Sequence, residues 1–429
     1  MRLRACLLAI AVVAPLPAFA QTPPPAAPPP PPPAMAAPPP PAAPPPPVVV
    51  TPAEPPPPAA AMPAPMAPPP PAAAPAGPAP KFTFGGLADT YWMYYFNPAD
   101  GSNSLVGPTA RAFDTNANSI TLALAKLSMN AALDPVSFQL DIGYGTSATI
   151  INGAASTGAV VPGFMVEQAY GEVALPGNLT LDFGKFTTTA GAEVIEANKN
   201  WLYSRSLLFN AIPLVHTGVR AGLKVNDQLS LQASVVNGWN NDPDSNAWKT
   251  IGLNATYVAS PMISVIPTVY FGKEAAEGAT GGTPGDVRLL VDVVVPITIN
   301  PNVGLNVNLD FIDAPNTLPF TVPGIAASMI PNPDSSSDYI FGASVMGKFT
   351  INEHAYLSAR GEFVRSHVSF MGVSGNNNMG EGTIMLGVPV GKNFEFRPEV
   401  RGDFSGDDVF AGGTKKNQFT GTLAALTFF

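Results

Sequence analysis

The chain has 429 residues, of which 46% are hydrophobic and only 12% charged, with a formal net charge of -9 and a mean hydropathy of +0.18. The acidic balance argues against a nucleic-acid partner, because such binding relies on clustered Lys and Arg. After the first 20 residues no segment offers 18 consecutive apolar residues, so membrane-spanning helices are excluded and alternating β-strands are the remaining source of the high hydropathy.

Residues 1–20 have the pattern of a secretory signal peptide. Two arginines precede an apolar run over residues 5–13, and the Ala-Phe-Ala sequence at 18–20 forms a cleavage pattern of small residues. The apolar run is too short for a membrane anchor, which needs about 20 residues. The one cysteine, Cys6, lies within this segment, so the mature chain would form no disulfide and offer no cysteine to a metal.

Residues 21–80 are almost entirely proline and alanine, with five runs of four or more prolines. Proline fixes φ and lacks a backbone donor, so this segment cannot pack a core and favours polyproline II. We expect a disordered periplasmic linker. It would act either as a solvated spacer or as a tether that contacts peptidoglycan.

From residue 81 onward, apolar and polar side chains alternate with a period of two. The clearest segment is 136–144, in which Val136, Phe138 and Leu140 share one face and polar side chains or glycine occupy the other. Segments of about ten residues with one apolar face are typical of strands that span an outer membrane.

We predict sixteen strands from this pattern. Their ranges are 82–96, 118–132, 136–148, 164–175, 179–187, 214–225, 228–238, 248–259, 262–273, 286–296, 302–313, 338–350, 354–366, 381–390, 393–404 and 417–429. Tight turns alternate with longer loops, and the turns lie at Asp134-Pro135, Pro176-Gly177-Asn178, Asn226-Asp227, Ser260-Pro261, Asn300-Pro301, Asn352-Glu353 and Gly391-Lys392. This alternation predicts an all-β fold, a transmembrane antiparallel barrel with periplasmic turns and external loops.

Three features depart from the alternation. Lys126 shares parity with Leu122 and Leu124, Pro267 interrupts a strand, and residues 286–296 are apolar on both faces. A β-bulge would explain the first two. A water-soluble β-sandwich is the alternative fold, but it does not require the rhythm of short turns and long loops.

The last predicted strand ends the chain on Phe429. A chain that ends inside a strand is explained if that strand pairs with the first one and leaves no free edge. The domain organisation is then a signal peptide at 1–20, a Pro/Ala-rich linker at 21–80 and an outer-membrane β-barrel at 81–429. About eight strands fill a lumen with side chains, whereas sixteen leave a water channel.

Aromatic residues gather at the predicted strand ends, as girdles at the membrane interfaces do. The candidates are Trp92, Tyr94 and Phe96 at the outer interface, and Phe394, Phe396 and Phe429 at the inner one.

Charged residues of inward parity are candidates for lining the pore. They are His216, Arg220, Lys224, Arg360, Glu362, Glu395, Arg397, Glu399 and Arg401. The opposite parity would expose arginine to lipid at a cost of about 2 to 4 kcal/mol near the membrane centre. These charges would form either a solvated wall of ion pairs or a transverse field that orders permeant ions.

The loop at 188–213 is the best candidate for a constriction. It mixes Glu193, Glu196, Lys199 and Arg205 with aromatic and aliphatic residues. Loops of this length are usually functional. If the loop folds inward, its aromatic side chains would be buried against the barrel wall and its charged side chains would project into the channel. The alternative is a loop packed across the outer rim.

One group of motifs surrounds this loop. It comprises Gly184-Lys185-Phe186, Gly191, Glu193, Asn200-Trp201, Tyr203-Ser204-Arg205-Ser206, Pro213, Thr217-Gly218 and Val235-Val236-Asn237-Gly238-Trp239. These residues resemble the OmpL-like β-barrel porin family of Gram-negative bacteria. The resemblance covers residues 81–429 and implies a porin-type channel of the outer membrane, but it identifies no solute. The proline-rich linker departs from it.

The expected function is passive diffusion of small hydrophilic solutes or ions, and the alternative is an envelope-anchoring barrel with a cell-wall tether. We expect no enzyme, since neither a G-x-S-x-G elbow nor an H-E-x-x-H pattern occurs. We expect no cofactor and no metal site, because the oxygen-rich segment 241–246 lacks the glycine and glutamate of an EF-hand loop. The expected partners are outer-membrane lipid, lipopolysaccharide, the barrel-assembly machinery, peptidoglycan through the linker, and further copies of the chain in a homotrimer.

Overall fold

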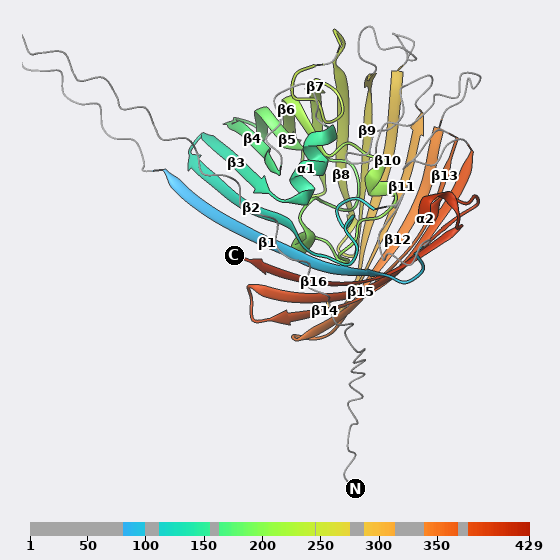
Figure 1. Cartoon of the computed structure of the whole chain (residues 1–429). Helices are drawn as coiled ribbons and strands as arrows, with labels where there is room; N and C mark the ends of the chain where they lie inside the picture. The colour runs from blue at the N-terminus through green and yellow to red at the C-terminus, as the bar shows by residue number, and fades with distance from the viewer. Residues whose placement is uncertain are drawn as a thin grey trace, which may run out of the picture. The chain divides into compact units, whose positions relative to one another are not determined.

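The computed structural model describes residues 80–98, 111–154, 163–244, 246–274, 287–313, 339–367 and 376–429. The predicted signal peptide, nearly all of the predicted linker and the predicted loop at 314–337 lie outside these residues. The described strands form one closed antiparallel barrel, in which each strand pairs with its neighbours in sequence and β16 pairs with β1 (Figure 1). The predicted barrel and its sixteen strands are confirmed.

The strands begin and end close to the predicted turns. They are β1 (Lys81–Tyr95), β2 (Ile120–Leu133), β3 (Val136–Tyr144), β4 (Phe164–Leu175), β5 (Leu179–Thr187), β6 (Val215–Lys224), β7 (Leu229–Val236), β8 (Thr250–Ser260), β9 (Ile263–Lys273), β10 (Val287–Asn300), β11 (Val303–Asp313), β12 (Tyr339–Asn352), β13 (Ala355–Ser366), β14 (Asn377–Val390), β15 (Phe394–Ser405) and β16 (Asn417–Phe428). All seven predicted tight turns separate consecutive strands.

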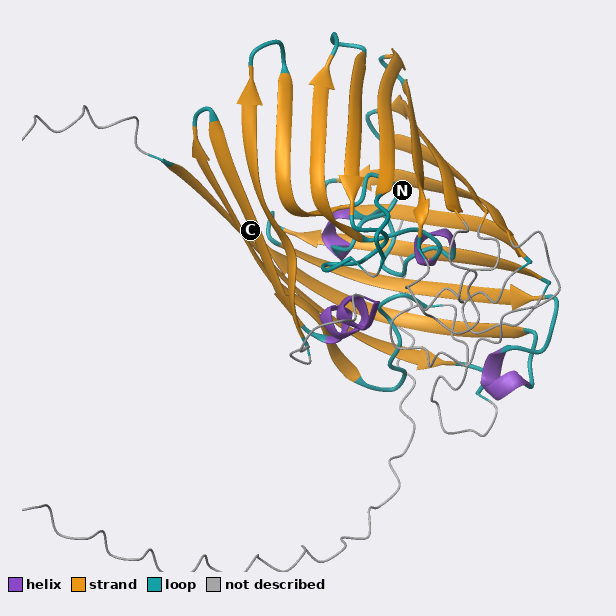
Figure 2. Ribbon diagram, turned by 90° about the horizontal axis from the view of Figure 1, so that it is seen from above, coloured by secondary structure: helices purple, strands orange, loops and turns teal. Residues whose placement is uncertain are grey.

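The described residues include four short helices: α1 (Thr146–Ala154), α2 (Phe410–Gly413), and the 3-10 helices η1 (Ala197–Lys199) and η2 (Leu208–Asn210). None of the described helices is long and apolar enough to cross a membrane. The predicted strand at 136–148 was too long, because β3 ends at Tyr144 and the chain turns into α1. The helix packs Ile150 and Ile151 into an apolar cluster with Phe209, so burial decides its conformation. Helices and loop segments lie within the ring of strands (Figure 2).

The pleat of each strand separates an inner from an outer surface. In β13 the side chains of Ser358, Arg360 and Glu362 are buried inside, while Leu357 and Phe363 are exposed outside. Successive side chains of a strand point to opposite faces, so this register fixes which residues can meet in the interior.

A bulge in β2 resolves the parity of Lys126. The pairing with β1 shifts between Asp89, opposite Leu124, and Thr90, opposite Leu122. One residue is therefore extra on β2, and Lys126 points inward although Leu122 points outward. The bulge expected at Pro267 is absent, since β9 keeps one register with β10 on both sides of that proline.

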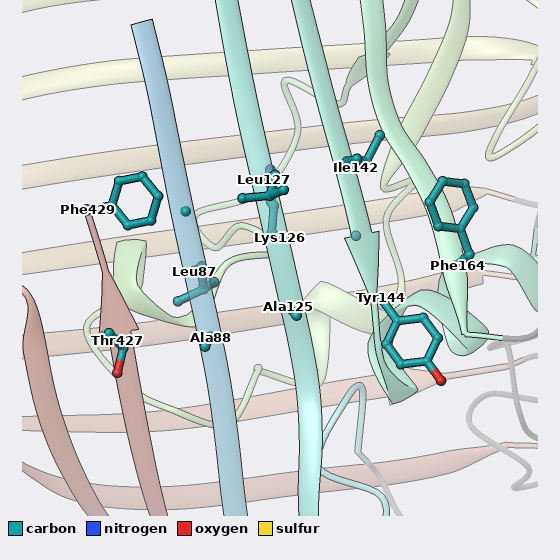
Figure 3. A pocket seen from close by; sticks show the side chains of 12 residues that line it. Leu87, Ala88, Ala125, Lys126, Leu127, Ile142, Tyr144, Phe164, Thr427 and Phe429 are labelled. Carbon is teal, nitrogen blue, oxygen red and sulfur yellow. The ribbon is translucent and has the colours of Figure 1, made fainter.

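The chain terminus closes the barrel. The Gly86 N–H donates to the Phe429 carbonyl, and the Phe429 N–H donates to the Gly86 carbonyl, both at 3.1 Å. Figure 3 shows the Phe429 ring beside β1, at one end of a shallow apolar hollow of about 370 Å³ on the outward face. A side chain on Gly86 would place its Cβ 2.4 Å from that ring, so the glycine makes room for the terminal aromatic.

Candidate functional site

The loop that joins β5 to β6, called here the interior loop (residues 188–213), lies inside the barrel (Figure 1). Leu207 and Leu208 pack in one cluster with Leu290 of β10 and Ile340 of β12, and this burial explains the apolar Leu290 on the inner face of β10, which also carries Arg288 and Asp292. Leu202 of the same loop packs in a second cluster, with side chains from β1, β12, β14 and β16. The loop therefore packs against several walls at once.

Two glutamates of the wall bind the main chain of the interior loop. Glu399 on β15 and Glu362 on β13 are both buried, and their carboxylates accept N–H groups from the loop. The donors to Glu399 are Tyr203 at 2.8 Å and Ser204 at 3.1 Å, and those to Glu362 are Leu207 at 2.6 Å and Leu208 at 2.8 Å. Each of these two side chains therefore pairs with two consecutive N–H groups of the loop that would otherwise be buried without partners.

Three arginines bind the carbonyl groups of the same loop. Their contacts are Arg397 to the carbonyls of Ala197 at 2.7 Å and Asn200 at 3.0 Å, Arg401 to that of Arg205 at 2.5 Å, and Arg360 to that of Ser204 at 2.9 Å. Arg360 also forms an ion pair with Glu193 of the loop at 2.8 Å. The charges of β13 and β15 thus satisfy backbone groups that a buried loop would otherwise leave without partners.

The start of the interior loop is held by β10 and β11. The carboxylate of Asp292 accepts the Gly191 N–H at 3.0 Å, and the amide oxygen of Asn308 accepts the Ala192 N–H at 3.1 Å. Asn308 also donates to Asp292 at 2.7 Å. The sequence reasoning missed Asp292, although a single acid within an otherwise apolar strand segment is a signal of a buried polar contact.

A buried charge cluster ties the loop to β2, β3 and β4. The ammonium of Lys126 lies 2.9 Å from Asp141, 2.6 Å from Glu167 and 2.7 Å from Glu196 of the loop. The three carboxylates lie close enough together to hold a metal ion, but the ammonium sits among them. Lys199 adds a second pair to Glu196 at 2.6 Å.

The carboxyl of Glu196 in the interior loop has a strongly lowered pKa. Burial raises the pKa of its carboxyl, but the charges of Lys126 and Lys199 outweigh burial and bring the pKa down to about 2. The group is therefore an anion over the whole physiological range, and it remains bound to both lysines.

Arg205 is enclosed by the loop itself. Its guanidinium donates to the carbonyls of Val194 at 2.9 Å and Ile195 at 2.5 Å, and it lies 5.4 Å from the centre of the Phe113 ring. Phe113 belongs to a segment after β1 that also enters the barrel, where buried Arg111 pairs with Asp114 at 2.7 Å and Asp403 at 3.4 Å. Sequence reasoning missed this second inserted segment.

The other predicted wall residues have separate surroundings. His216 is buried, stacks on Tyr270 at 4.6 Å between ring centres, and has Nδ1 2.9 Å from the Gly238 carbonyl. Arg220 lies 2.7 Å from Asp182 and 4.4 Å from the centre of the Phe186 ring. Lys224 pairs with Asp227 at 2.8 Å near the tight turn between β6 and β7, and Glu395 pairs with Arg397 at 3.1 Å.

The expectation that the charged side chains of the interior loop project into the channel needs correction. Glu193 and Glu196 are each 6% exposed and Arg205 is 3% exposed, because wall residues and main-chain carbonyls hold them. The side chain of Lys199 is 61% exposed. The inward charges of β15, Glu395 to Arg401, are also buried, and most of them bind the loop rather than line an open lumen.

Family comparison agrees with this architecture. Residues 81–429 match the family described as "Putative beta-barrel porin-2, OmpL-like". The chain belongs to this porin family. No curated protein matches its sequence.

Solved outer-membrane structures share the fold of this porin at low sequence identity. The channel DcaP of Acinetobacter baumannii is 13% identical with a TM-score of 0.54, and the match covers 82% of this chain and 97% of that one. The anion-selective porin of Comamonas acidovorans is 10% identical with a TM-score of 0.52, and OmpT of Vibrio cholerae in its trimer form is 12% identical with a TM-score of 0.50; both matches cover 82% of this chain and 100% of the other. These likenesses establish the fold.

The porin's predicted girdle residues lie on the outer surface or near it. Trp92, Tyr94, Phe96, Phe396 and Phe429 are exposed, and Phe394 is half-buried. Within each group the rings touch: Tyr94 lies 5.2 Å from Phe96, and Phe394 lies 4.7 Å from Phe396, measured between ring centres. Their outward parity is the one required of interface aromatics.

A cavity of about 300 Å³ lies between the interior loop and the adjoining ends of β4 and β5. Its walls include Gln168, the hydroxyl-bearing Thr187 to Thr189, Phe209 and Lys199. This is the size at which pockets begin to accept small molecules. The surface beside the exposed ammonium of Lys199 is thus concave and mixed in polarity.

The segment between β7 and β8 that was considered for a metal site uses its acidic oxygens within the protein. Asp242 lies 2.9 Å from the Lys185 ammonium and accepts the Thr217 hydroxyl at 3.0 Å. Asp244 pairs with Lys249 and accepts the Asn246 N–H at 3.0 Å. Ammonium groups and turn hydrogen bonds occupy the oxygens that a cation would need.

Proposed function

We propose that this porin allows passive diffusion of small hydrophilic solutes through the outer membrane of a Gram-negative bacterium. The observation that carries the proposal is the interior loop, which charged wall residues on β2 to β4 and β10 to β15 fix inside the barrel. Sixteen strands give a lumen wide enough for water, and an anchored loop narrows it without a moving part. Family membership and the porin-like fold support the same function. The proposal assigns no catalysis to the barrel.

The route for solutes follows the part of the wall where inward polar side chains stay partly exposed. The anchors of the loop come from β10 to β15 and from β2 to β4. Inward polar side chains on β3 to β8 keep partial exposure, namely Gln139, Tyr170, Arg220, Gln232 and Asn254. A polar, partly solvated wall of this kind is what a diffusion channel requires.

Conductance of the full chain in planar lipid bilayers tests the proposal. We expect stepwise increases of current in KCl, and replacing residues 191–210 by a short Gly-Ser linker should raise the current of each step. A heat-unfolded sample of the same preparation is the control. Refolded protein that inserts into the bilayer and gives no steps would sink the porin proposal.

An envelope anchor is the alternative, and the proline-rich segment favours it. Deletion of residues 22–80 separates the two roles. A porin keeps its conductance after the deletion, whereas an anchor loses its association with peptidoglycan in cell-wall pull-down.

We further propose that outer-membrane lipid and lipopolysaccharide surround the porin and that the barrel-assembly machinery inserts it. We also propose a homotrimer, as in the OmpT trimer form, which native mass spectrometry would check.

A further inference from the structure

The outer surface of the barrel carries almost no charge, and the exceptions lie at one rim. Among the described strand residues, four charged side chains share the parity of exposed apolar neighbours: Lys185, Lys273, Asp313 and Arg365. Each lies at the loop end of an odd-numbered strand. A charge facing lipid is costly at the membrane centre and nearly free at the interface. Their position therefore marks the headgroup level of the outer leaflet.

The cations at this rim differ in what they bind. Lys185 pairs with Asp242 at 2.9 Å, and the Lys273 ammonium lies 4.1 Å above the Trp248 ring. Arg365 is exposed, and its Nη2 lies 3.5 Å from Nε2 of His367. No described carboxylate lies within ion-pair distance of the Arg365 guanidinium. Its five N–H donors therefore have no anionic partner among the described residues.

The surroundings of Arg365 are ordered and aromatic. Its cross-strand partner on β12 is Phe341, whose own partner on β11 is Phe311, and both phenyl rings are exposed outside. The His367 ring stacks on Tyr339 at 4.2 Å between centres, and the His367 N–H donates to the Tyr339 carbonyl at 2.8 Å. The imidazole beside the guanidinium is thus held in place.

The other neighbour of Arg365 in this row is polar. Asn378 on β14 pairs with Arg365 across the sheet and is exposed, so its amide is available as a donor. The row across β11 to β14 therefore reads Phe311, Phe341, Arg365 and Asn378, with apolar surface on one side and hydrogen-bond donors on the other. Lipid tails would contact the former and a charged headgroup the latter.

From this arrangement we infer that Arg365, with His367 and Asn378, forms a binding site for a phosphate group of an outer-leaflet glycolipid. The planar guanidinium matches phosphate with two parallel hydrogen bonds, and clustered cations at a membrane surface recognise anionic headgroups. The exposed Phe311 and Phe341 select a lipid rather than free phosphate, since they supply a surface for acyl chains. The inference rests on the outer-membrane location proposed above and not on conductance.

Native mass spectrometry of the full chain tests the site. The protein is reconstituted in nanodiscs with bisphosphorylated lipid A, or with the same lipid after phosphatase treatment, and the retained lipid is counted. R365Q should lower retention of the phosphorylated lipid roughly fivefold and leave the dephosphorylated lipid unchanged. R365K should keep part of the binding, and K392Q, at the exposed periplasmic turn, should change neither.

The outcomes that overturn the inference are distinct from those that overturn the porin. Equal retention by R365Q and wild type, an equal loss for both lipids, or displacement by inorganic phosphate at equal concentration would each refute the lipid site. Circular dichroism confirms that R365Q keeps its strands; should it misfold, the double variant H367A/N378A must show the same selective loss. A barrel without conductance that retains the lipid through Arg365 would refute only the porin proposal.

Discussion

The guanidinium of Arg360 on β13 lies 2.8 Å from the carboxylate of Glu193 in the interior loop, an ion pair between residues 167 positions apart in sequence. Both side chains are almost fully buried. Arg360 also contacts Glu381 on β14 and the Ser204 carbonyl. One side chain therefore joins two strands of the wall to the loop that narrows the lumen.

Arg360→Met should destabilise the barrel strongly. The change leaves Glu193 buried without its cation and Glu381 with Arg401 alone, at 3.5 Å. Breaking a buried pair from one side costs about 3 to 5 kcal/mol. Urea unfolding of the protein in lipid vesicles measures the loss. The same variant should show noisier single-channel current, because the loop loses its central anchor.

The matched control for this variant is Lys224→Met. Lys224 pairs with Asp227 near the tight turn between β6 and β7, where its side chain is 58% exposed, and solvent screens such a pair. Its unfolding midpoint should stay near that of wild type. Equal midpoints for Arg360→Met and wild type would show that the loop does not depend on this anchor.

The strands of this protein could be predicted because their signals are local. Each tight turn carries its own chemistry, and each strand repeats a period of two, so the pairing order of the barrel followed from the chain order. Parity even placed Arg397 and Glu399 inside. The bulge that turns Lys126 inward was also visible as a break in the apolar pattern.

The partners of these inward residues could not be predicted. Glu399 accepts main-chain N–H groups from Tyr203 and Ser204, and main-chain groups have no sequence signature. The contacts of Arg111 with Asp403 join segments whose separation in sequence carries no pattern. Such contacts depend on how deep a loop enters the barrel, which is decided by packing of residues such as Leu207 against several strands.

Gly184→Ala should destabilise the barrel through the backbone alone. Gly184 has φ +133°, and a Cβ there would lie 2.2 Å from the Ala169 carbonyl oxygen and 2.9 Å from the Tyr170 Cα. A backbone neighbour cannot move aside easily, so we expect a loss of at least about 1 to 3 kcal/mol. Refolding yield into vesicles and the urea midpoint measure it.

Gly361→Ala on β13 is the control for this glycine. Nothing lies within 4 Å of a Cβ at that position, which faces outward. A change within about 0.5 kcal/mol is expected there. If Gly184→Ala were as stable as Gly361→Ala, β4 and β5 could move apart enough to make room for the Cβ without a loss of stability.

The stability of the barrel should fall in acid partly through Glu196. Its pKa in the folded protein is about 2, below the ordinary 4.5, although burial opposes the shift, because Lys126 and Lys199 favour the anion. A group with a depressed folded pKa stabilises above its unfolded pKa and loses that contribution as pH falls towards the folded one. The contribution is therefore complete above about pH 4.5 and declines from there towards pH 2.

Unfolding of wild type and Glu196→Gln between pH 6 and pH 2 checks this linkage. The stability difference between the two should be largest at pH 6 and shrink below pH 4.5. Glu353→Gln serves as control, since that side chain is 85% exposed in a turn. A difference that stays constant over the whole range would rule out Glu196 as the titrating group.

Lys199→Glu should shift the ion selectivity of the porin towards cations. The Lys199 side chain is 61% exposed beside the cavity of the interior loop, and its ammonium lies 2.6 Å from Glu196. The substitution replaces an exposed cation by an anion and leaves Glu196 with Lys126 alone. A charge a few ångströms from a permeant ion changes the energy of that ion by about 1 kcal/mol in water, and by more where the walls exclude water. Reversal potentials in a KCl gradient should therefore move in the cation-selective direction, with Lys199→Gln between the two.

The salt dependence of that shift identifies its cause. The field of a charge reaches about 10 Å at 0.1 M salt but only about 3 Å at 1 M before it is screened. The effect of an exposed charge on the solute path should therefore be larger in dilute KCl. Lys392→Glu, on the tight turn between β14 and β15, provides a cation-to-anion change away from the loop. If Lys199→Glu and Lys392→Glu give the same reversal potential as wild type, permeant ions do not pass the interior loop at Lys199, and the route along β3 to β8 must be abandoned.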